Sequence, residues 1–128
     1  MNKIITRNDL REILKKWKKG EMSPKEVHDW AGELYPADFV DYDDWELNQE
    51  NSVTNEVLAK LDTIDMNLTT TEDIPALLRF LETPIGKFHE GLEKLEKYIN
   101  SINYKAREAE LASIDFYEPF CKWKQLTI

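Results

Sequence analysis

The chain has 128 residues, a formal net charge of −8 and a single cysteine. This excess of negative charge argues against general binding to nucleic acids or anionic membranes, because attraction to phosphates requires a positive surface. The sequence has no apolar run of about 18 residues, no secretory signal and no second cysteine, so we expect one cytosolic domain without a membrane span or an internal disulfide.

Two helices are predicted in the first third of the chain, over residues 7–19 and 24–35. Thr6 is a suitable N-cap for the first helix, because its hydroxyl can accept a hydrogen bond from an amide of the first turn. Ser23, followed three residues later by Glu26, is the pattern of a capping box for the second helix. The short connection between the helices predicts an antiparallel hairpin.

The remaining sequence predicts an acidic inter-helix loop and four further helices. We expect the loop over residues 36–51 and the helices over 52–64, 74–82, 84–102 and 104–113. The helix over 84–102 shows the clearest periodicity, because its apolar residues recur every three or four positions. The prediction is a compact, single-domain all-α bundle of about five to six helices, with this helix as its spine.

The two tryptophans of the first hairpin, the C-terminal aromatic residues and the cysteine are expected in the core. Trp17 and Trp30 fall on the apolar faces of the first two helices and are predicted to pack across the hairpin. The aromatic tail over residues 115–123 is predicted to fold back onto the bundle. Cys121 in this tail is expected to be a small buried side chain.

Negative charge is concentrated in the middle of the chain. Residues 33–73 contain 12 of the 25 acidic residues and one basic residue, Lys60, so their formal charge is −11. Phe39, Tyr42 and Trp45 are spaced so that one helical turn, around residues 42–47, could direct all three rings to one side. Charge runs are usually solvated faces, but Tyr and Trp are enriched at interface hot spots, so both interpretations stay open. The candidate partner-binding residues are Asp38, Phe39, Asp41, Tyr42, Asp43, Asp44, Trp45 and Glu46.

The sequence contains no recognised catalytic or metal-binding motif. A calcium-binding loop that started at Asp41 would need an oxygen ligand in place of Trp45 and a glycine in place of Glu46. His28 and His89 lie on different predicted helices, which makes a shared zinc site a poor fit. We therefore predict no metal, no cofactor and no catalytic residue. Paired carboxylates could still perform acid–base chemistry in a pocket that separates their pKa values.

Three stretches of the chain carry a resemblance to known proteins. They are Trp17 followed by G-E-x-S-x-x-E-V-x-x-W-A at 20–31, D-I-P-A-L-L at 73–78 and D-F-Y-x-P-F-C at 115–121. In this order they resemble a group of small all-helical bacterial proteins. Some members of that group are immunity proteins of contact-dependent growth inhibition systems, which neutralise a toxic nuclease domain delivered by neighbouring cells. The shared positions are mainly helix caps and core aromatic residues, so the resemblance transfers no individual binding residue.

The resemblance and the acidic segment together predict a non-enzymatic immunity protein in the cytoplasm. It would bind its cognate toxin domain as a monomer in a 1:1 complex and would contact neither nucleic acid nor membrane. The toxin is expected to be a basic nuclease, with RNase favoured over DNase by the resemblance, and its active site would be covered by the acidic, aromatic surface. The alternatives are a small enzyme with an unrecognised carboxylate site and a regulatory adaptor without a toxin partner.

Overall fold

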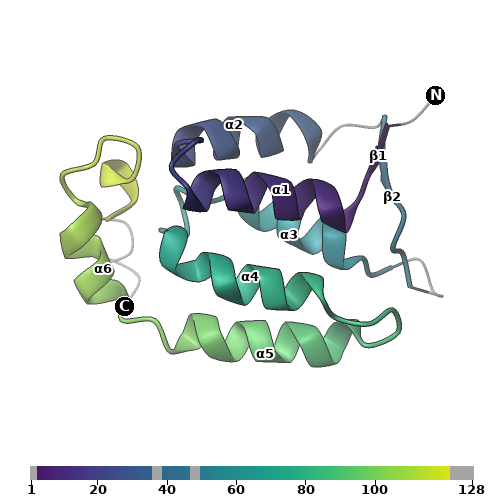
Figure 1. The fold of residues 1–128 in the computed structure, drawn as a ribbon. Coiled ribbons are helices and arrows are strands. Elements are labelled where there is room, and N and C mark those ends of the chain that lie inside the picture. The colour runs from purple at the N-terminus through teal and green to yellow at the C-terminus, as the bar shows by residue number, and fades with distance from the viewer. Residues whose placement is uncertain (1–2, 36–38, 47–49, 122–128) are drawn as a thin grey trace.

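The computed structural model describes residues 3–35, 39–46 and 50–121 and shows stacked helices with a short sheet at one end (Figure 1). The elements in chain order are β1 (Lys3–Ile5), α1 (Arg7–Lys18), α2 (Pro24–Leu34), β2 (Val40–Tyr42), α3 (Val53–Leu61), the 3-10 helix η1 (Thr71–Asp73), α4 (Ile74–Leu81), α5 (Phe88–Asn100) and α6 (Tyr104–Leu111). The mostly helical fold is confirmed. A strictly all-α fold is wrong, because β1 pairs with β2. No helix within the described ranges is long and apolar enough to cross a lipid bilayer.

The sheet joins two segments that lie far apart in the sequence. β1 and β2 run parallel, with Ile4 opposite Asp41 and Ile5 opposite Tyr42. Successive side chains of a strand point to opposite faces, so Ile5 and Tyr42, 1% and 9% exposed, face the core while Ile4 and Asp41 lie on the outer face. Strands of three residues are too short to show this alternation in a sequence. The helical turn predicted around residues 42–47 is wrong over its described part, residues 42–46, because Tyr42 ends β2 and Trp45 forms an antiparallel bridge with Ser52.

The predicted caps set the starts of α1 and α2. The hydroxyl of Thr6 accepts a hydrogen bond from the amide of Asp9, and the carboxylate of Asp9 accepts one from the amide of Thr6. Ser23 and Glu26 exchange the same two hydrogen bonds at α2, where Pro24 is the first residue. The two helices lie side by side (Figure 1), which confirms the predicted hairpin.

Helix α4 lies in the middle of the bundle. It packs against α1, α3 and α5 (Figure 1). Its buried residues are Ile74, Ala76, Leu77, Phe80 and Leu81. Helix α5 has only two buried residues, Phe88 and Leu95, and lies at the edge of the bundle. The prediction that the helix over 84–102 forms the spine is therefore wrong, and α4 has that role.

The helix predicted over 84–102 begins at Phe88 instead. Gly86 has a φ of +93°, a left-handed conformation that interrupts a right-handed helix and that glycine adopts without strain. Ile85, which the periodicity placed on the apolar face, is 56% exposed. The residues after Pro84 therefore form a turn between α4 and α5, and this turn takes part in positioning the acidic segment.

The C-terminal aromatic segment packs back onto the helices, as predicted, over the part described to residue 121. Tyr117 and Cys121 are buried, and the Tyr117 hydroxyl donates a hydrogen bond to the carbonyl of Thr69 at 2.5 Å. Burial raises the pKa of the Cys121 thiol, and the charges of Glu108 and Glu118 act in the same direction. Cys121 is thus buried, as predicted, and its raised pKa makes the thiol a poor nucleophile.

Trp17 is one of the large core residues, with 3% of its surface exposed, whereas Trp30 is half-buried. We expect Trp17→Ala to lower the free energy of unfolding by about 3–5 kcal/mol. For a domain of this size the melting temperature then falls by about 10–20 °C in a circular-dichroism melt. Phe39→Ala is the matched control, because Phe39 is 53% exposed and its removal should leave the melt nearly unchanged. A wild-type melt for Trp17→Ala would contradict its burial.

Candidate functional site

The predicted partner-binding residues lie at the end of the molecule that carries the sheet (Figure 1). β2 continues into residues 43–46, where Trp45 forms an antiparallel bridge with Ser52, just before α3. Asp38 lies outside the described residues. The other seven are Phe39, Asp41, Tyr42, Asp43, Asp44, Trp45 and Glu46. They divide into residues whose side chains are bound within the fold and residues that face solvent.

Asp44 is bound within the fold and is 5% exposed. Its carboxylate accepts hydrogen bonds from Nε of Arg7 at 2.9 Å, from the Ser52 hydroxyl, and from the amide and hydroxyl of Thr54 at 3.0 and 2.9 Å. Burial opposes ionisation of this carboxyl, but the hydrogen bonds from Ser52, Arg7 and Thr54 outweigh it and lower its pKa. Asp44 joins α1 to the start of α3, and these contacts remove it from the predicted binding surface.

Asp41, Tyr42 and Trp45 form one local cluster. The indole Nε1 of Trp45 donates a hydrogen bond to Oδ1 of Asp41 at 2.8 Å, and the amide of Tyr42 donates to the same oxygen at 2.8 Å. These two bonds lower the pKa of Asp41. The Tyr42 and Trp45 rings meet edge to face with centroids 5.7 Å apart. Tyr42 therefore faces the core, while Asp41 and Trp45 are half-buried in a fixed arrangement.

Glu46 fixes the far end of the acidic segment. Its Oε2 accepts hydrogen bonds from the amides of Gly86 at 2.5 Å and of Phe88 at 3.1 Å. The first amides of a helix have no partner within the helix, and a carboxylate at this end also meets the favourable end of the helix dipole. Glu46 thus caps the first residue of α5 from a position 42 residues earlier in the chain.

Phe39 and Asp43 are the exposed members of the predicted set. Phe39 is 53% exposed, and the neighbouring strand adds Ile4, which is 50% exposed. Phe39 directly precedes β2, and its carbonyl accepts a hydrogen bond from the amide of Lys3 at 2.6 Å, which places it next to β1. We call Ile4, Phe39 and Asp41 the outer sheet face. The reasoning from the sequence missed Ile4, because a three-residue strand with a distant partner leaves no local signal.

Arg7 is a second residue that the sequence did not identify. Its Nη1 donates hydrogen bonds to the carbonyls of Leu81 at 2.9 Å and Thr83 at 2.5 Å, while its Nε holds Asp44. One guanidinium therefore connects the first turn of α1, the acidic segment and the end of α4. An arginine in a first helical turn carries no pattern that predicts this role, because every partner is distant in sequence.

A buried ion pair lies elsewhere in the molecule, beside a cavity of about 350 Å³. Arg107 holds Asp73 with two hydrogen bonds, Nη1 to Oδ2 at 2.8 Å and Nη2 to Oδ1 at 3.1 Å. The Tyr98 hydroxyl donates to Oδ1 of Asp73 at 2.6 Å. Burial and the hydrogen bond to Asp73 raise the pKa of Tyr98 to about 12. The pair connects the start of α4 to α6.

The enzyme alternative predicts two or more carboxylates with separated pKa values in one pocket. Within the described residues, this cavity is lined by a single carboxylate, Asp73. Both oxygens of Asp73 are bound by Arg107. The arrangement is that of a structural ion pair, and it lends no support to acid–base catalysis at this cavity.

The two histidines occupy separate environments. His28 has Nε2 at 3.5 Å from Asp65 and Nδ1 at 3.4 Å from Asp29, whereas Nε2 of His89 lies 3.4 Å from the side-chain amide of Asn51. Across residues 3–35, 39–46 and 50–121, no three His, Cys, Asp or Glu side chains are grouped so that they could hold a metal ion. The predicted absence of a metal stays a prediction.

No protein-family model, curated protein or solved structure matches this chain at a significant level. The resemblance to immunity proteins therefore stays a prediction. The functional argument depends on the charge distribution and on the outer sheet face.

Proposed function

We propose that this chain is a non-enzymatic immunity protein that binds and neutralises a cognate toxin domain. The toxin is a basic nuclease, an RNase rather than a DNase, and the complex contains one immunity protein and one toxin in the cytoplasm. The contact surface consists of the outer sheet face and the adjacent Asp43. The proposal rests on one observation: exposed apolar side chains and carboxylates lie next to one another at the end of the molecule that carries the sheet.

The first supporting point is electrostatic. Residues 33–73 have a formal charge of −11, and Asp43 remains exposed next to the sheet. A surface of one sign accelerates encounters with a partner of the opposite sign, up to about 10⁸–10⁹ M⁻¹s⁻¹ at low salt. An active site that attracts RNA phosphates has the positive charge that such a surface requires.

The second supporting point is the apolar part of the same surface. Phe39, just before β2, is 53% exposed, and Ile4 of the adjacent β1 is 50% exposed. Burial of large side chains at the centre of an interface accounts for most of the affinity of typical complexes and slows dissociation. The Asp41–Trp45 hydrogen bond holds the neighbouring carboxylate in place before binding, so little ordering is needed when the partner arrives.

The proposal is tested with the protein encoded immediately upstream, since a toxin gene is expected to precede its immunity gene. Adding this chain should abolish the nuclease activity of that protein at a 1:1 ratio. In stopped-flow measurements, the association rate constant should fall steeply as sodium chloride rises from about 20 to 500 mM, because salt screens the attraction. An association rate constant that does not change with ionic strength contradicts the electrostatic argument.

Phe39→Ala tests the apolar contact. We expect the dissociation constant for the toxin to rise about tenfold or more, mainly through faster dissociation, because a buried aromatic anchor is lost. Ile114→Ala is the matched control, since Ile114 is 44% exposed but follows α6 at the opposite end of the molecule (Figure 1). Surface plasmon resonance measures both variants. Equal affinities for Phe39→Ala and Ile114→Ala would place the interface elsewhere.

A further inference from the structure

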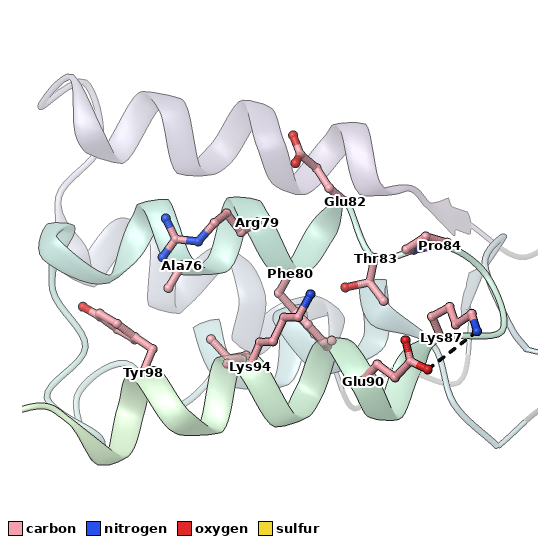
Figure 2. Close-up of a pocket in the computed structure, with 12 residues that line it drawn as sticks. Ala76, Arg79, Phe80, Glu82, Thr83, Pro84, Lys87, Glu90, Lys94 and Tyr98 are labelled. Atoms are coloured by element: carbon pink, nitrogen blue, oxygen red, sulfur yellow. Dashed lines mark ion pairs between the residues drawn. The ribbon is translucent and has the colours of Figure 1, made fainter.

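A groove of about 510 Å³ runs between α4 and α5, and none of its lining residues belongs to the outer sheet face (Figure 2). Its apolar part is formed by Ala76 and Phe80 of α4 and Leu95 of α5. All three are at most 5% exposed, so they form a packed floor. The groove therefore has the concave, largely preformed shape that small-molecule sites share.

Two exposed cations of the lining, Arg79 and Lys94, have no ion-pair partner among the described residues. Figure 2 shows Lys94 extending from α5 toward α4, while the Arg79 side chain lies along α4 at the other side of the groove. Within the described part of the chain, no carboxylate oxygen lies within the 4.0 Å of an ion pair from the nitrogens of Arg79 or Lys94. The sequence pattern pairs Glu90 with Lys94, but Glu90 lies 3.6 Å from Lys87 instead. Because Glu90 pairs with Lys87, Arg79 and Lys94 are available to bind an anion.

The groove is thus positive in a negative protein. Its lining residues include three cations, Arg79, Lys87 and Lys94, and two carboxylates, Glu82 and Glu90, whereas the chain as a whole carries −8. An anion is attracted to this groove more than to the rest of the surface, where carboxylates predominate.

The packing of the helix connection fixes one end of the groove. The Thr83 side chain is buried and lies so close to Gly91 that a Cβ at position 91 would overlap it. Glycine therefore permits Thr83 to pack at the mouth, and the backbone carbonyl of Thr83 is held by Arg7 at 2.5 Å. These contacts tie the mouth of the groove to α1 and to the first turns of α5.

We propose that the α4–α5 groove binds a small organic anion with an apolar body. The acid group lies between Arg79 and Lys94, and the body lies on Phe80 and Leu95. The volume fits, because small-molecule sites have volumes of about 300–1,000 Å³. An inorganic anion would contact the cations but not the apolar floor, and a neutral hydrocarbon would contact the floor but not the cations. The combination of both features defines the ligand class.

The test uses 1-anilinonaphthalene-8-sulfonate, a fluorescent aromatic sulfonate, as the probe. We expect saturable 1:1 binding to the folded chain and a dissociation constant about tenfold higher for the double variant Arg79→Ala/Lys94→Ala, because two charge contacts are lost. The uncharged analogue N-phenyl-1-naphthylamine should bind more weakly and equally to both proteins. Lys97→Ala/Lys105→Ala is the matched control, because both lysines are exposed and lie outside the groove. Identical thermal melts show that no variant binds the dye through unfolding.

Several results would overturn this proposal. One is an unchanged dye affinity in Arg79→Ala/Lys94→Ala, and another is equal affinity for inorganic phosphate, which would indicate a simple anion patch. Loss of dye binding in Phe39→Ala would place the dye on the outer sheet face. Dye binding that weakens as sedimentation shows dimers would mean that a second copy of the chain fills the groove. None of these results depends on the toxin partner, so the groove and the immunity function are tested separately.

Discussion

Arg107→Ala is expected to lower the free energy of unfolding by about 3–5 kcal/mol, because it leaves the carboxylate of Asp73 buried without its partner. Arg107 and Asp73 are each 6% exposed, so water cannot replace the lost contact easily. The guanidinium also donates to the carbonyl of Leu68 at 3.2 Å, and this buried carbonyl loses its donor too. The effect exceeds that of a surface ion pair, for which about 0–1 kcal/mol is typical.

Urea unfolding followed by tryptophan fluorescence measures this change. Lys105→Ala is the matched control, because Lys105 is an exposed cation two residues earlier on α6 and should change stability by less than about 0.5 kcal/mol. Tyr98→Phe should have an intermediate effect, about 1–2 kcal/mol, because it removes one hydrogen bond to Asp73 and keeps the ion pair. Equal stabilities of Arg107→Ala and Lys105→Ala would show that the ion pair does not hold α6 on the bundle.

Asp44→Ala is expected to be similarly damaging, at about 3–5 kcal/mol, because it leaves Arg7 and the polar groups of Ser52 and Thr54 without their acceptor. The neighbouring Asp43→Ala provides the control within the same acidic segment, since Asp43 is exposed and should change stability by less than about 0.5 kcal/mol. Chemical unfolding of the two variants separates structural carboxylates from solvent-facing ones. A similar, small effect of both would contradict the structural role of Asp44.

The contribution of Asp44 should also depend on pH. Its pKa is lowered in the folded state, because the hydrogen bonds from Ser52, Arg7 and Thr54 outweigh the opposing effect of burial. The stabilisation from a lowered pKa is complete above the unfolded value of about 3.9 and is lost as pH falls toward the folded value. The stability difference between wild type and Asp44→Ala should therefore be constant between about pH 5 and 7 and shrink below about pH 4. A difference that grows in acid would contradict the lowered pKa.

The helix starts were predictable because their signals are local. Thr6 with Asp9 and Ser23 with Glu26 form reciprocal hydrogen bonds within four residues of chain, so the pattern alone identifies them. Asn103 likewise accepts a hydrogen bond from the amide of Ala106 at the start of α6. In these places the sequence determines the structure through neighbours along the chain.

Features that depend on distant partners were not predictable. The start of α5 moves to Phe88 because Gly86 adopts a left-handed conformation and Glu46 binds the free amides. The strand at Ile4 exists because it finds its partner at Asp41. In each contact the two residues lie about 40 positions apart, so no short stretch of sequence contains both. Local secondary-structure propensity therefore cannot predict either contact.

The candidate site shows the same division. The concentration of charge could be read from composition, but the helical spacing that grouped Phe39 with Tyr42 and Trp45 was wrong, because Tyr42 faces the core. Charge count alone could not show that Asp44 and Glu46 hold the fold together, because their donors come from Arg7, Thr54 and Gly86. An acidic segment thus contains both structural and solvent-facing carboxylates, and the sequence does not distinguish them.

The contacts of Arg7 have a consequence for synthesis of the chain. The guanidinium reaches its carbonyl acceptor at Thr83 across a sequence separation of 76 residues. A ribosome that adds about 5–20 residues per second needs roughly 4–15 s between these two positions. During that interval α1 has been made, but Arg7 lacks its acceptor at the end of α4. A nascent chain that ends before Thr83 should therefore remain protease-sensitive at its N-terminal helices. Protection should appear only after α4 and the turn that follows it have emerged.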